Sequence, residues 1–362
     1  MTANLVSLVI DGREHRGWTE VGISRSIESM TGSFQLSLSR REATAEAVLT
    51  LRAGAAVEVR IDGETVITGW LDTFAPQIDG ESATIVATGR DRAADLIDCS
   101  ADIQPGSWQN VPVETIVRAL VAPFGITVEF PKPSGAPIRR FALQPGETVQ
   151  AAIERLLRFR GWIAWSRADG TLVVGSPQGQ DTTTKVVRIE EGVNLLSASA
   201  SHNVAERFSA YIVRGQASGD DEANGRAVAQ IKGQAIDPAV KRHRPLVIVA
   251  EEQSTADSAR LRAEWEANVR AGRAQTADVT VQGWRDADGA LWAPDRLVEL
   301  KSPTLAIDAR MLVVGVEFVR AGDGTTATLT LQPPEAWQQL PVPEEAETGA
   351  VKRDRSKPKG KS

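Results

Sequence analysis

Apolar and polar residues alternate along most of the first 90 or so residues, a pattern typical of half-buried β-strands. Within 17–39, Val21, Ile23 and Ile27 would share one face of a strand, with Ser24 and Ser26 on the other. The next run repeats the alternation at Phe34, Leu36 and Leu38. Two consecutive strands are therefore predicted here, joined by a turn near Gly32.

Three further strands are predicted in "AAVEVRID", "TVITGWLDTFAPQI" and "ESATIVATGRD". The dipeptides Asp62-Gly63 and Asp79-Gly80 separate them, and Asp-Gly is a strong signal for a tight hairpin turn. The N-terminal quarter of the chain is thus expected to be almost entirely β.

The pattern becomes mixed after the short helix predicted in "RDRAADLIDC". A helix is expected in "PVETIVRALVAPFG", stopped by Pro123 and Gly125, and "ITVEF" is expected to be a strand. A second helix would bury Val149 and Ile153 and end at Gly161. The runs "WIAWS" and "TLVVG" complete the pattern as a hairpin, so 99–180 is predicted to be a small α/β module.

Strand patterns return from Lys185 onward and are interrupted by one long helix, expected at about 255–271. Leu261, Trp265 and Val269 are spaced four apart and would form its buried stripe, and Glu266 with Arg270 would form a surface ion pair. The helix is expected to pack on a sheet.

The last β segment, from "DRLVELKS" to "LTLQPPEAW", parallels the segment from "AAVEVRID" to "TIVATGRD". Each has a strand, a turn, a strand leading into a glycine, an aromatic residue shortly after, and a Thr-rich closing strand. The sequence pairs Gly69 with Gly315 and Phe74 with Phe318. We interpret this as a repeat of one β unit, although the identity is low.

The predicted fold is mainly β with α+β inserts. Its expected divisions are a β domain over 1–98, with strands from about 186–215 as candidates to complete it, the α/β module over 99–180, a second β domain with small inserts over 186–340, and a disordered basic tail over 341–362.

Charge is distributed unevenly along the 362 residues. The last twelve residues carry six Lys or Arg and one Asp, while the other residues hold 35 basic and 46 acidic side chains. An acidic body argues against a large phosphate-binding surface. The tail could bind an anion through Lys352, Arg353, Arg355, Lys357, Lys359 and Lys361.

Cofactor, metal and catalytic signatures are not expected in this chain. Cys99 is the lone cysteine, and His15, His202 and His243 are scattered, which fits a reducing compartment. No apolar run of about 18 residues and no signal-peptide pattern occurs, so the chain is expected neither to span a membrane nor to be secreted. Nucleophile and nucleotide-binding motifs are likewise missing from the sequence. Adjacent acid pairs, which we interpret as solvated surface, are Glu190-Glu191, Asp220-Asp221 and Glu251-Glu252.

Three residues are candidates for contact with another subunit. Arg25 falls on the apolar side of its strand, where the alternatives are a snorkelling side chain or a bulge. Trp108 and Trp337 lie in polar or Pro-rich surroundings, whereas most other tryptophans lie within β patterns and are expected in the core.

Five stretches follow one another in order over about residues 5–340: "DGREHRGWTEVGISRSIESMTGSFQL", "GRDRAADLIDCS", "RFSAYIVRGQ", "KRHRPLVIVAE" and "GWRDADGALWAPDRLVEL". Together they resemble the baseplate hub proteins of Mu-like contractile-tailed phages. Hub proteins of other contractile tails and of type VI secretion are related to this family.

The resemblance implies two tube-protein-like β-barrel domains per chain and a homotrimer with a pseudo-sixfold ring. Such a structural virion protein, made in the host cytoplasm and needed for tail assembly, would adapt the sixfold tail tube to the threefold membrane-piercing spike. It would contact neighbouring baseplate wedge proteins and meet DNA only in transit, without stable membrane association. The alternative is a carbohydrate- or cell-wall-binding β protein of a tail tip, for which "GETV" and its following helix are the sequence hint.

Overall fold

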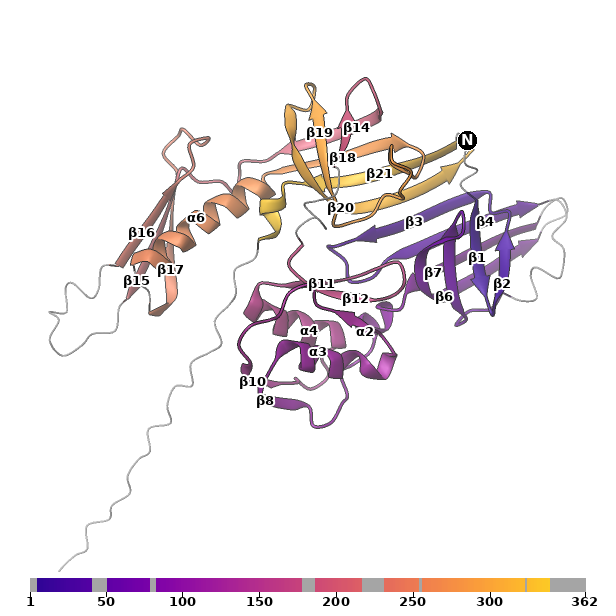
Figure 1. Ribbon diagram of the computed structural model, residues 1–362, viewed down its shortest axis with the longest axis horizontal. Helices are drawn as coiled ribbons and strands as arrows, with labels where there is room; N and C mark the ends of the chain where they lie inside the picture. The colour runs from indigo at the N-terminus through magenta and orange to yellow at the C-terminus, as the bar shows by residue number, and fades with distance from the viewer. Residues whose placement is uncertain are drawn as a thin grey trace, which may run out of the picture.

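The computed structural model describes residues 5–40, 51–78, 83–177, 186–216, 231–253, 256–322 and 324–338. A 13-stranded sheet runs through the molecule in the order β14-β18-β21-β20-β3-β4-β7-β6-β5-β1-β2, with β19 on β20 and β13 on β19 (Figure 1). Its strands are β1 Val6–Ile10, β2 Arg13–Arg16, β3 Glu20–Ser26, β4 Ser33–Arg40, β5 Ala56–Ile61, β6 Glu64–Ile78, β7 Ala83–Asp91, β13 Val187–Glu190, β14 Leu195–His202, β18 Gln275–Gln282, β19 Leu297–Ser302, β20 Ile307–Ala321 and β21 Gly324–Gln332.

The predicted alternation of the N-terminal strands is confirmed by burial. Ile23 and Leu36 are fully buried, whereas Ser24 and Gln35 between them are exposed. Both central residues of the Asp62-Gly63 turn have positive φ, as a two-residue hairpin turn requires. The Asp79-Gly80 turn lies outside the described residues.

The sheet contains the same five-strand unit twice. The N-terminal copy runs β3-β4-β7-β6-β5, and the C-terminal copy runs β14-β18-β21-β20-β19, with antiparallel neighbours throughout. The last three strands have equal lengths in the two copies: 6 residues in β5 and β19, 15 in β6 and β20, and 9 in β7 and β21.

The two copies join edge to edge. Strand β20 pairs antiparallel with β3 from Gly315↔Ser26 to Arg320↔Val21, and we call this contact the internal junction. Phe318 and Ile23 face each other there, both with 0% exposure, within one apolar cluster that includes residues of both copies. The mainly β prediction is confirmed, but the strands among the described residues follow an open path and do not close into separate barrels.

Strands between 186 and 215, suggested to complete the first β domain, pair elsewhere. Strand β13 pairs with β19, and β14 pairs with β18, so both belong to the C-terminal half of the sheet. Strand β15 lies in a separate sheet. Chain order alone does not determine which sheet a strand joins, because β pairing depends on long-range register.

The predicted α/β module follows β7 and has its own apolar core. Its elements are α2 Ala94–Asp98, β8 Ser107–Val111, α3 Val113–Val121, η1 Ala122–Phe124, β9 Val128–Glu129, β10 Ile138–Ala142, α4 Val149–Leu157, η2 Arg158–Arg160, β11 Ile163–Ser166 and β12 Leu172–Gly175. The Thr148 side chain caps α4 by accepting from Ala151 N at 3.2 Å. Gly161, with φ +62°, ends the helical segment as predicted.

A third unit is inserted between β14 and β18. It contains β15 Ala210–Gln216, β16 Ile231–Ile236, β17 Pro245–Gln253 and α6 Ala256–Arg273, and the helix covers one face of the small sheet (Figure 1). A short helical turn, η3 Pro334–Trp337, packs against α6 after the last strand.

The stripe predicted for this helix is confirmed at Val269, which is 1% exposed, but it is wrong at Leu261. Leu261 is 57% exposed, and the face toward the sheet is formed instead by Ala259, Ala263 and Ala267. Small residues are needed because the helix backbone lies against β16: a Cβ added at Gly233 would be 2.1 Å from the carbonyl carbon of Ala259. The ion pair between Glu266 and Arg270 is present at 3.0 Å, but Glu266 is buried.

Candidate functional site

The sheet face opposite the core is hollowed at the internal junction into a groove of about 770 Å³ lined by β3, β4, β6, β7 and β20. Alternate residues of these strands point into it. Most are polar: Glu20, Ser24, Ser33, Gln35, Thr73, Thr88, Arg90 and Glu317. We call this surface, together with its continuation on the C-terminal copy, the polar sheet face.

Short hydroxyl side chains dominate the continuation on the C-terminal copy. They follow β14, β18 and β21 at Ser197, Ser199, Ser201, Thr276, Thr280, Thr326, Thr328 and Thr330. Two hydrogen bonds link them across strands: Thr280 to Thr328 at 3.2 Å between the hydroxyls, and Thr330 to Asp278 at 2.8 Å. Such a surface is polar, carries little net charge and has short side chains that project little from the sheet.

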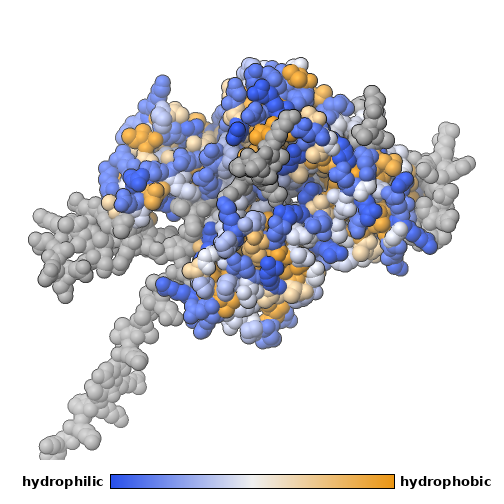
Figure 2. Space-filling model, in the orientation of Figure 1, coloured by the Kyte–Doolittle hydropathy of each residue, from blue (hydrophilic) through white to orange (hydrophobic). Residues whose placement is uncertain are grey.

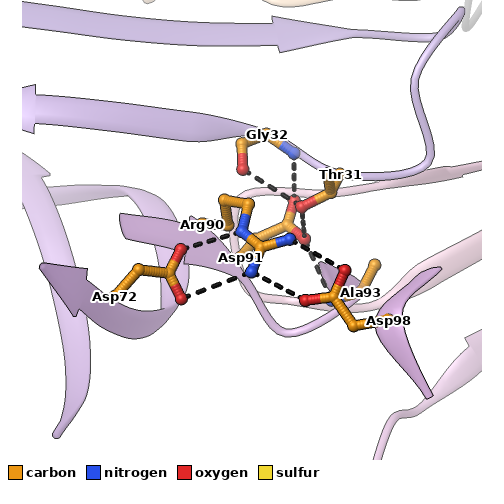
Figure 3. Close-up of polar contacts among 7 residues, drawn as sticks. All are labelled: Thr31, Gly32, Asp72, Arg90, Asp91, Ala93 and Asp98. Atoms are coloured by element: carbon orange, nitrogen blue, oxygen red, sulfur yellow. Dashed lines mark hydrogen bonds and ion pairs between the residues drawn. The ribbon is translucent and has the colours of Figure 1, made fainter. Parts of the chain in front are cut away.

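A buried carboxylate, Asp91, ties the sheet to the α/β module at the end of β7 (Figure 3). It accepts hydrogen bonds from Thr31 Oγ1 at 2.7 Å, Gly32 N at 2.6 Å and Ala93 N at 2.9 Å. The Ser166 hydroxyl on β11 donates a fourth. Burial raises the pKa of Asp91, while these hydrogen bonds act to lower it.

The adjacent Arg90 lies on the polar sheet face and bridges two carboxylates (Figure 3). Its Nε is 2.8 Å from Asp72 Oδ2, and its terminal nitrogen is 2.8 Å from Asp98 Oδ2 in α2. These hydrogen bonds raise the pKa of Arg90 and lower that of Asp98. Sequence analysis did not identify these contacts of Arg90 and Asp91 between the sheet and the module, although the Gly-Arg-Asp triplet at a predicted domain boundary was a usable signal.

Arg25 lies at the internal junction, opposite Val316 of β20. It lines a cavity of about 390 Å³ between the sheet, the β11–β12 turn and the segment 293–296. Burial lowers the pKa of Arg25, and the nearby carboxylates of Asp91 and Asp169 oppose this effect. Its described neighbours belong to its own chain, and a role between subunits stays a prediction.

Trp108 and Trp337 are both half-buried. Trp108 packs in the module core with Phe141, their ring centres 6.0 Å apart. Trp337 packs where the module meets the sheet, against a cluster containing Ile27 and Trp165. On the face of the molecule in Figure 2, hydrophobic residues lie in small groups between hydrophilic ones. Both rings therefore pack against apolar neighbours of the chain, whereas a carbohydrate platform uses exposed rings.

Of the adjacent acid pairs, Glu190-Glu191 has described side chains, and both carboxylates are engaged in contacts within the sheet. Glu190 pairs with Lys301 at 2.8 Å, and Glu191 accepts from Ser302 at 2.5 Å and from Thr304 at 2.6 Å. Asp220-Asp221 and the side chains of Glu251-Glu252 lie outside the described part of the chain. No group of three or more potential metal ligands occurs in the part of the chain that the structure describes, nor is any described helix long and apolar enough to cross a bilayer. The basic tail, from Lys352 to Lys361, lies outside the described residues.

Four family models match successive parts of the chain. Residues 5–91 match "Mu phage baseplate assembly protein GpP-like, N-terminal", and 93–176 match "Baseplate hub protein gp44-like, second domain". Residues 207–266 match "Tail protein NMB1110-like, third domain", and 254–340 match "Mu phage baseplate assembly protein GpP, fourth domain". The first two matches cover the N-terminal copy and the module, and the last two cover parts of the third unit and of the C-terminal copy and overlap at the start of α6.

Individual proteins are similar over almost the whole length. The baseplate hub protein gp44 of Escherichia phage Mu is 35% identical over 92% of this chain and 89% of its own. The 43 kDa tail protein of prophage MuSo2 from Shewanella oneidensis superposes with a TM-score of 0.78 at 31% identity, over 93% and 100% of the two chains. A tail protein from Neisseria meningitidis gives 0.72 at 25% identity, over 92% and 98%.

Proposed function

This chain belongs to the family of Mu-like phage baseplate hub proteins, and from that premise we propose that three copies form a ring between tail tube and spike. Each chain holds the five-strand unit twice, so a trimer would present six similar units around one axis. The observation that carries this proposal is the internal junction, where two such units already share one sheet. A ring of this kind would meet a sixfold tube on one side and a threefold spike on the other.

In this proposal the polar sheet face forms the channel wall through which DNA passes. Its short hydroxyl residues would let a polyanion slide, because strong binding to nucleic acid requires several Lys or Arg at phosphates. Arg90 on this face is already paired with two carboxylates. The role is structural rather than enzymatic, in a baseplate assembled from proteins made in the host cytoplasm, with wedge proteins as further neighbours and no stable membrane association.

The test is the mass of the purified protein by light scattering on a size-exclusion column, across a tenfold range of concentration. We expect a species near three times 38.9 kDa. Electron microscopy of that species should show a ring with six similar units. A monomer at every concentration would contradict the trimer.

The channel proposal has its own test. The trimer should not retain a short DNA duplex at low salt, since the wall offers few phosphate contacts. Binding that weakens steeply with added salt would instead indicate a basic lumen.

A further inference from the structure

The two copies can be aligned residue by residue through their bulges. The β6–β7 ladder is irregular between Leu71 and Thr73, and the β20–β21 ladder is irregular between Val313 and Gly315. Superposing the irregularities makes Thr73 equivalent to Gly315, and Pro76 equivalent to Phe318. The pairing suggested by sequence alone, Phe74 with Phe318, is therefore displaced by two residues.

The same reasoning aligns β14 with β3. Gly22 pairs with Gln35, which pairs with Thr88. In the C-terminal copy Ser199 pairs with Asp278, which pairs with Thr330. Because Thr88 and Thr330 occupy equivalent positions, Ser199 is the equivalent of Gly22, and Ala200 is the equivalent of Ile23.

The internal junction uses one edge of each copy, and the complementary edges have no strand partner among the described residues. The pairing of β6 with β5 ends at Trp70, and β14 pairs only with β18 among the described strands. Residues 73–78 of β6 correspond to the part of β20 that pairs with β3, and Ile78 at their end is 87% exposed. On β14, Ala198 and Ala200 are half-buried. An open edge with exposed apolar residues is a template for pairing with another chain.

We propose that this partner is a second copy of the chain. Strand β14 pairs antiparallel with residues 73–78 of β6 in the neighbouring subunit, in the register of the internal junction. Val319↔Gly22 at the internal junction becomes Gln77↔Ser199 between subunits, and Phe318↔Ile23 becomes Pro76↔Ala200. The inference rests on the proposed ring and specifies how its subunits join.

Side chains on the core side of this contact are complementary. Phe74 and Ile78 lie on that side of β6, and Ala198 and Ala200 lie on that side of β14, where both alanines already pack against the apolar cluster. Pairing would place Ala198 opposite Ile78, as the internal junction places Val21, which is 3% exposed, opposite Arg320. Apolar surface now open to water would be buried on assembly.

The position of Pro76 also fits an edge that pairs late. At the internal junction Ile27 N donates to Val314 O at 2.9 Å, so Val314, Val316 and Phe318 direct their backbone groups toward β3. Pro76, equivalent to Phe318, thus directs its backbone nitrogen, which has no hydrogen, toward the open edge. Proline is tolerated in strands at such edges, and it leaves the subunit contact with one donor fewer than the internal junction.

Cysteine pairs test the register. Hydrogen-bonded and non-hydrogen-bonded pairs alternate along an antiparallel ladder, so Val319↔Gly22 at the internal junction is a non-hydrogen-bonded pair. Its equivalent between subunits, Gln77↔Ser199, would then have Cα atoms about 4.5 Å apart, a spacing that a disulfide can bridge. In a Cys99→Ser background, Gln77→Cys with Ser199→Cys should give covalent dimers and trimers on a non-reducing gel after mild oxidation. The matched control, Thr73→Cys with Ser199→Cys, is misaligned by four residues and should stay monomeric on that gel.

Light scattering of the Cys99→Ser parent separates this inference from the proposed ring. A trimer whose matched pair does not cross-link, or whose control cross-links equally well, overturns the edge pairing and leaves the ring standing. A parent that is monomeric at every concentration overturns both.

Charge substitutions give a second readout that does not depend on oxidation. Gln77→Lys with Ser199→Lys should shift the trimer toward monomer at a given concentration, and Gln77→Glu with Ser199→Lys should restore it. Circular dichroism of each variant confirms folding. Equal masses for the two double variants would contradict the pairing.

Discussion

The two copies of the five-strand unit have similar strands and very different connections. In the N-terminal copy the short segment 27–32 joins the first two strands, whereas 203–274 connects their equivalents in the C-terminal copy and contains the whole third unit. An insertion at a strand end leaves the ladder intact, and longer loops cost little additional entropy. The strand ladder is therefore the feature that the two copies share, while strand ends accommodate added units.

The copies also differ in the state of their edges. Phe318 at the internal junction is fully buried, but its equivalent, Pro76, is exposed on the open edge of β6. The same position is therefore core in one copy and surface in the other. Substitutions at equivalent positions should have unequal effects on the isolated chain.

The largest difference is expected for Phe318→Ala against Pro76→Ala. Phe318→Ala leaves a cavity at the internal junction and removes an edge-to-face contact with Trp284, and it should lower the free energy of unfolding by about 3–5 kcal/mol. Pro76→Ala should change it by about 1 kcal/mol or less. Urea unfolding of the two variants checks this, and equal losses would mean that Phe318 does not hold the copies together.

A second difference concerns Gly69 and Gly315, which the sequence pairs but the ladder does not. A Cβ at Gly69 would be 2.0 Å from the carbonyl oxygen of Arg90, whereas the nearest atom to a Cβ at Gly315 is 3.7 Å away. Gly69→Ala should destabilise by at least about 1–3 kcal/mol, because backbone must move. Gly315→Ala should be neutral or stabilising by up to about 1 kcal/mol.

Thermal unfolding of the two alanine variants provides the measurement, with the wild-type chain in the same buffer. If Gly315→Ala were the more damaging substitution, the difference in space around the two glycines would not govern their stability effects.

Much of the β architecture could be predicted from the sequence because alternation survives in a single chain. The strands around Ile23 and Leu36, the module helices and a helix near 255–271 are all present. Residue equivalence between the copies could not be predicted, because a bulge adds one residue to a strand without changing the composition around it. The buried face of α6 was misread because Ala259 and Ala263 carry a weaker apolar signal than Leu261.

The candidate site was harder to predict than the fold. The edges of β6 and β14 become visible only when pairing partners are known, and β14 has the sequence of an unremarkable Ser/Ala strand. Asp91 gave no signal as a buried residue, because its four donors come from segments around Thr31, Ala93 and Ser166 that are far apart in the chain. Contacts that depend on tertiary placement are beyond pattern analysis.

Asp91 supplies the third test, since its equivalent in the C-terminal copy is Pro333, which leads into η3 and carries no such network. Asp91→Asn places an amide where a carboxylate accepts four hydrogen bonds and should cost about 1–3 kcal/mol at pH 7. The module is expected to loosen from the sheet, and the C-terminal copy should be unaffected. Hydrogen exchange resolved by segment can distinguish the two regions.

The loss in free energy of unfolding caused by Asp91→Asn should depend on pH in a definite direction. Because burial raises the pKa of Asp91 above its ordinary value of 3.8, the folded chain keeps this proton where the unfolded chain has lost it. The stability contributed by the group therefore falls as pH rises from about 4 through the raised pKa. Urea titrations should show a larger loss for Asp91→Asn at pH 4 than at pH 7, and an opposite trend would contradict the raised pKa.

Arg90→Gln should have the smallest effect, because Gln332 already occupies the equivalent position in the C-terminal copy. Arg90 is 35% exposed at its side chain, and its pairs with Asp72 and Asp98 lie in contact with solvent. Exposed ion pairs of this kind contribute little to the free energy of unfolding, and salt screens their attraction. Unfolding in low salt should show a loss smaller than that of Asp91→Asn, and the loss should vanish in about 1 M NaCl, where the Debye length is about 3 Å. A loss of stability that persists in high salt would mean that Arg90 acts through packing across the sheet–module boundary. Arg90 and Asp91 would then stabilise that boundary together, and Arg90 would not be a separate surface ion pair.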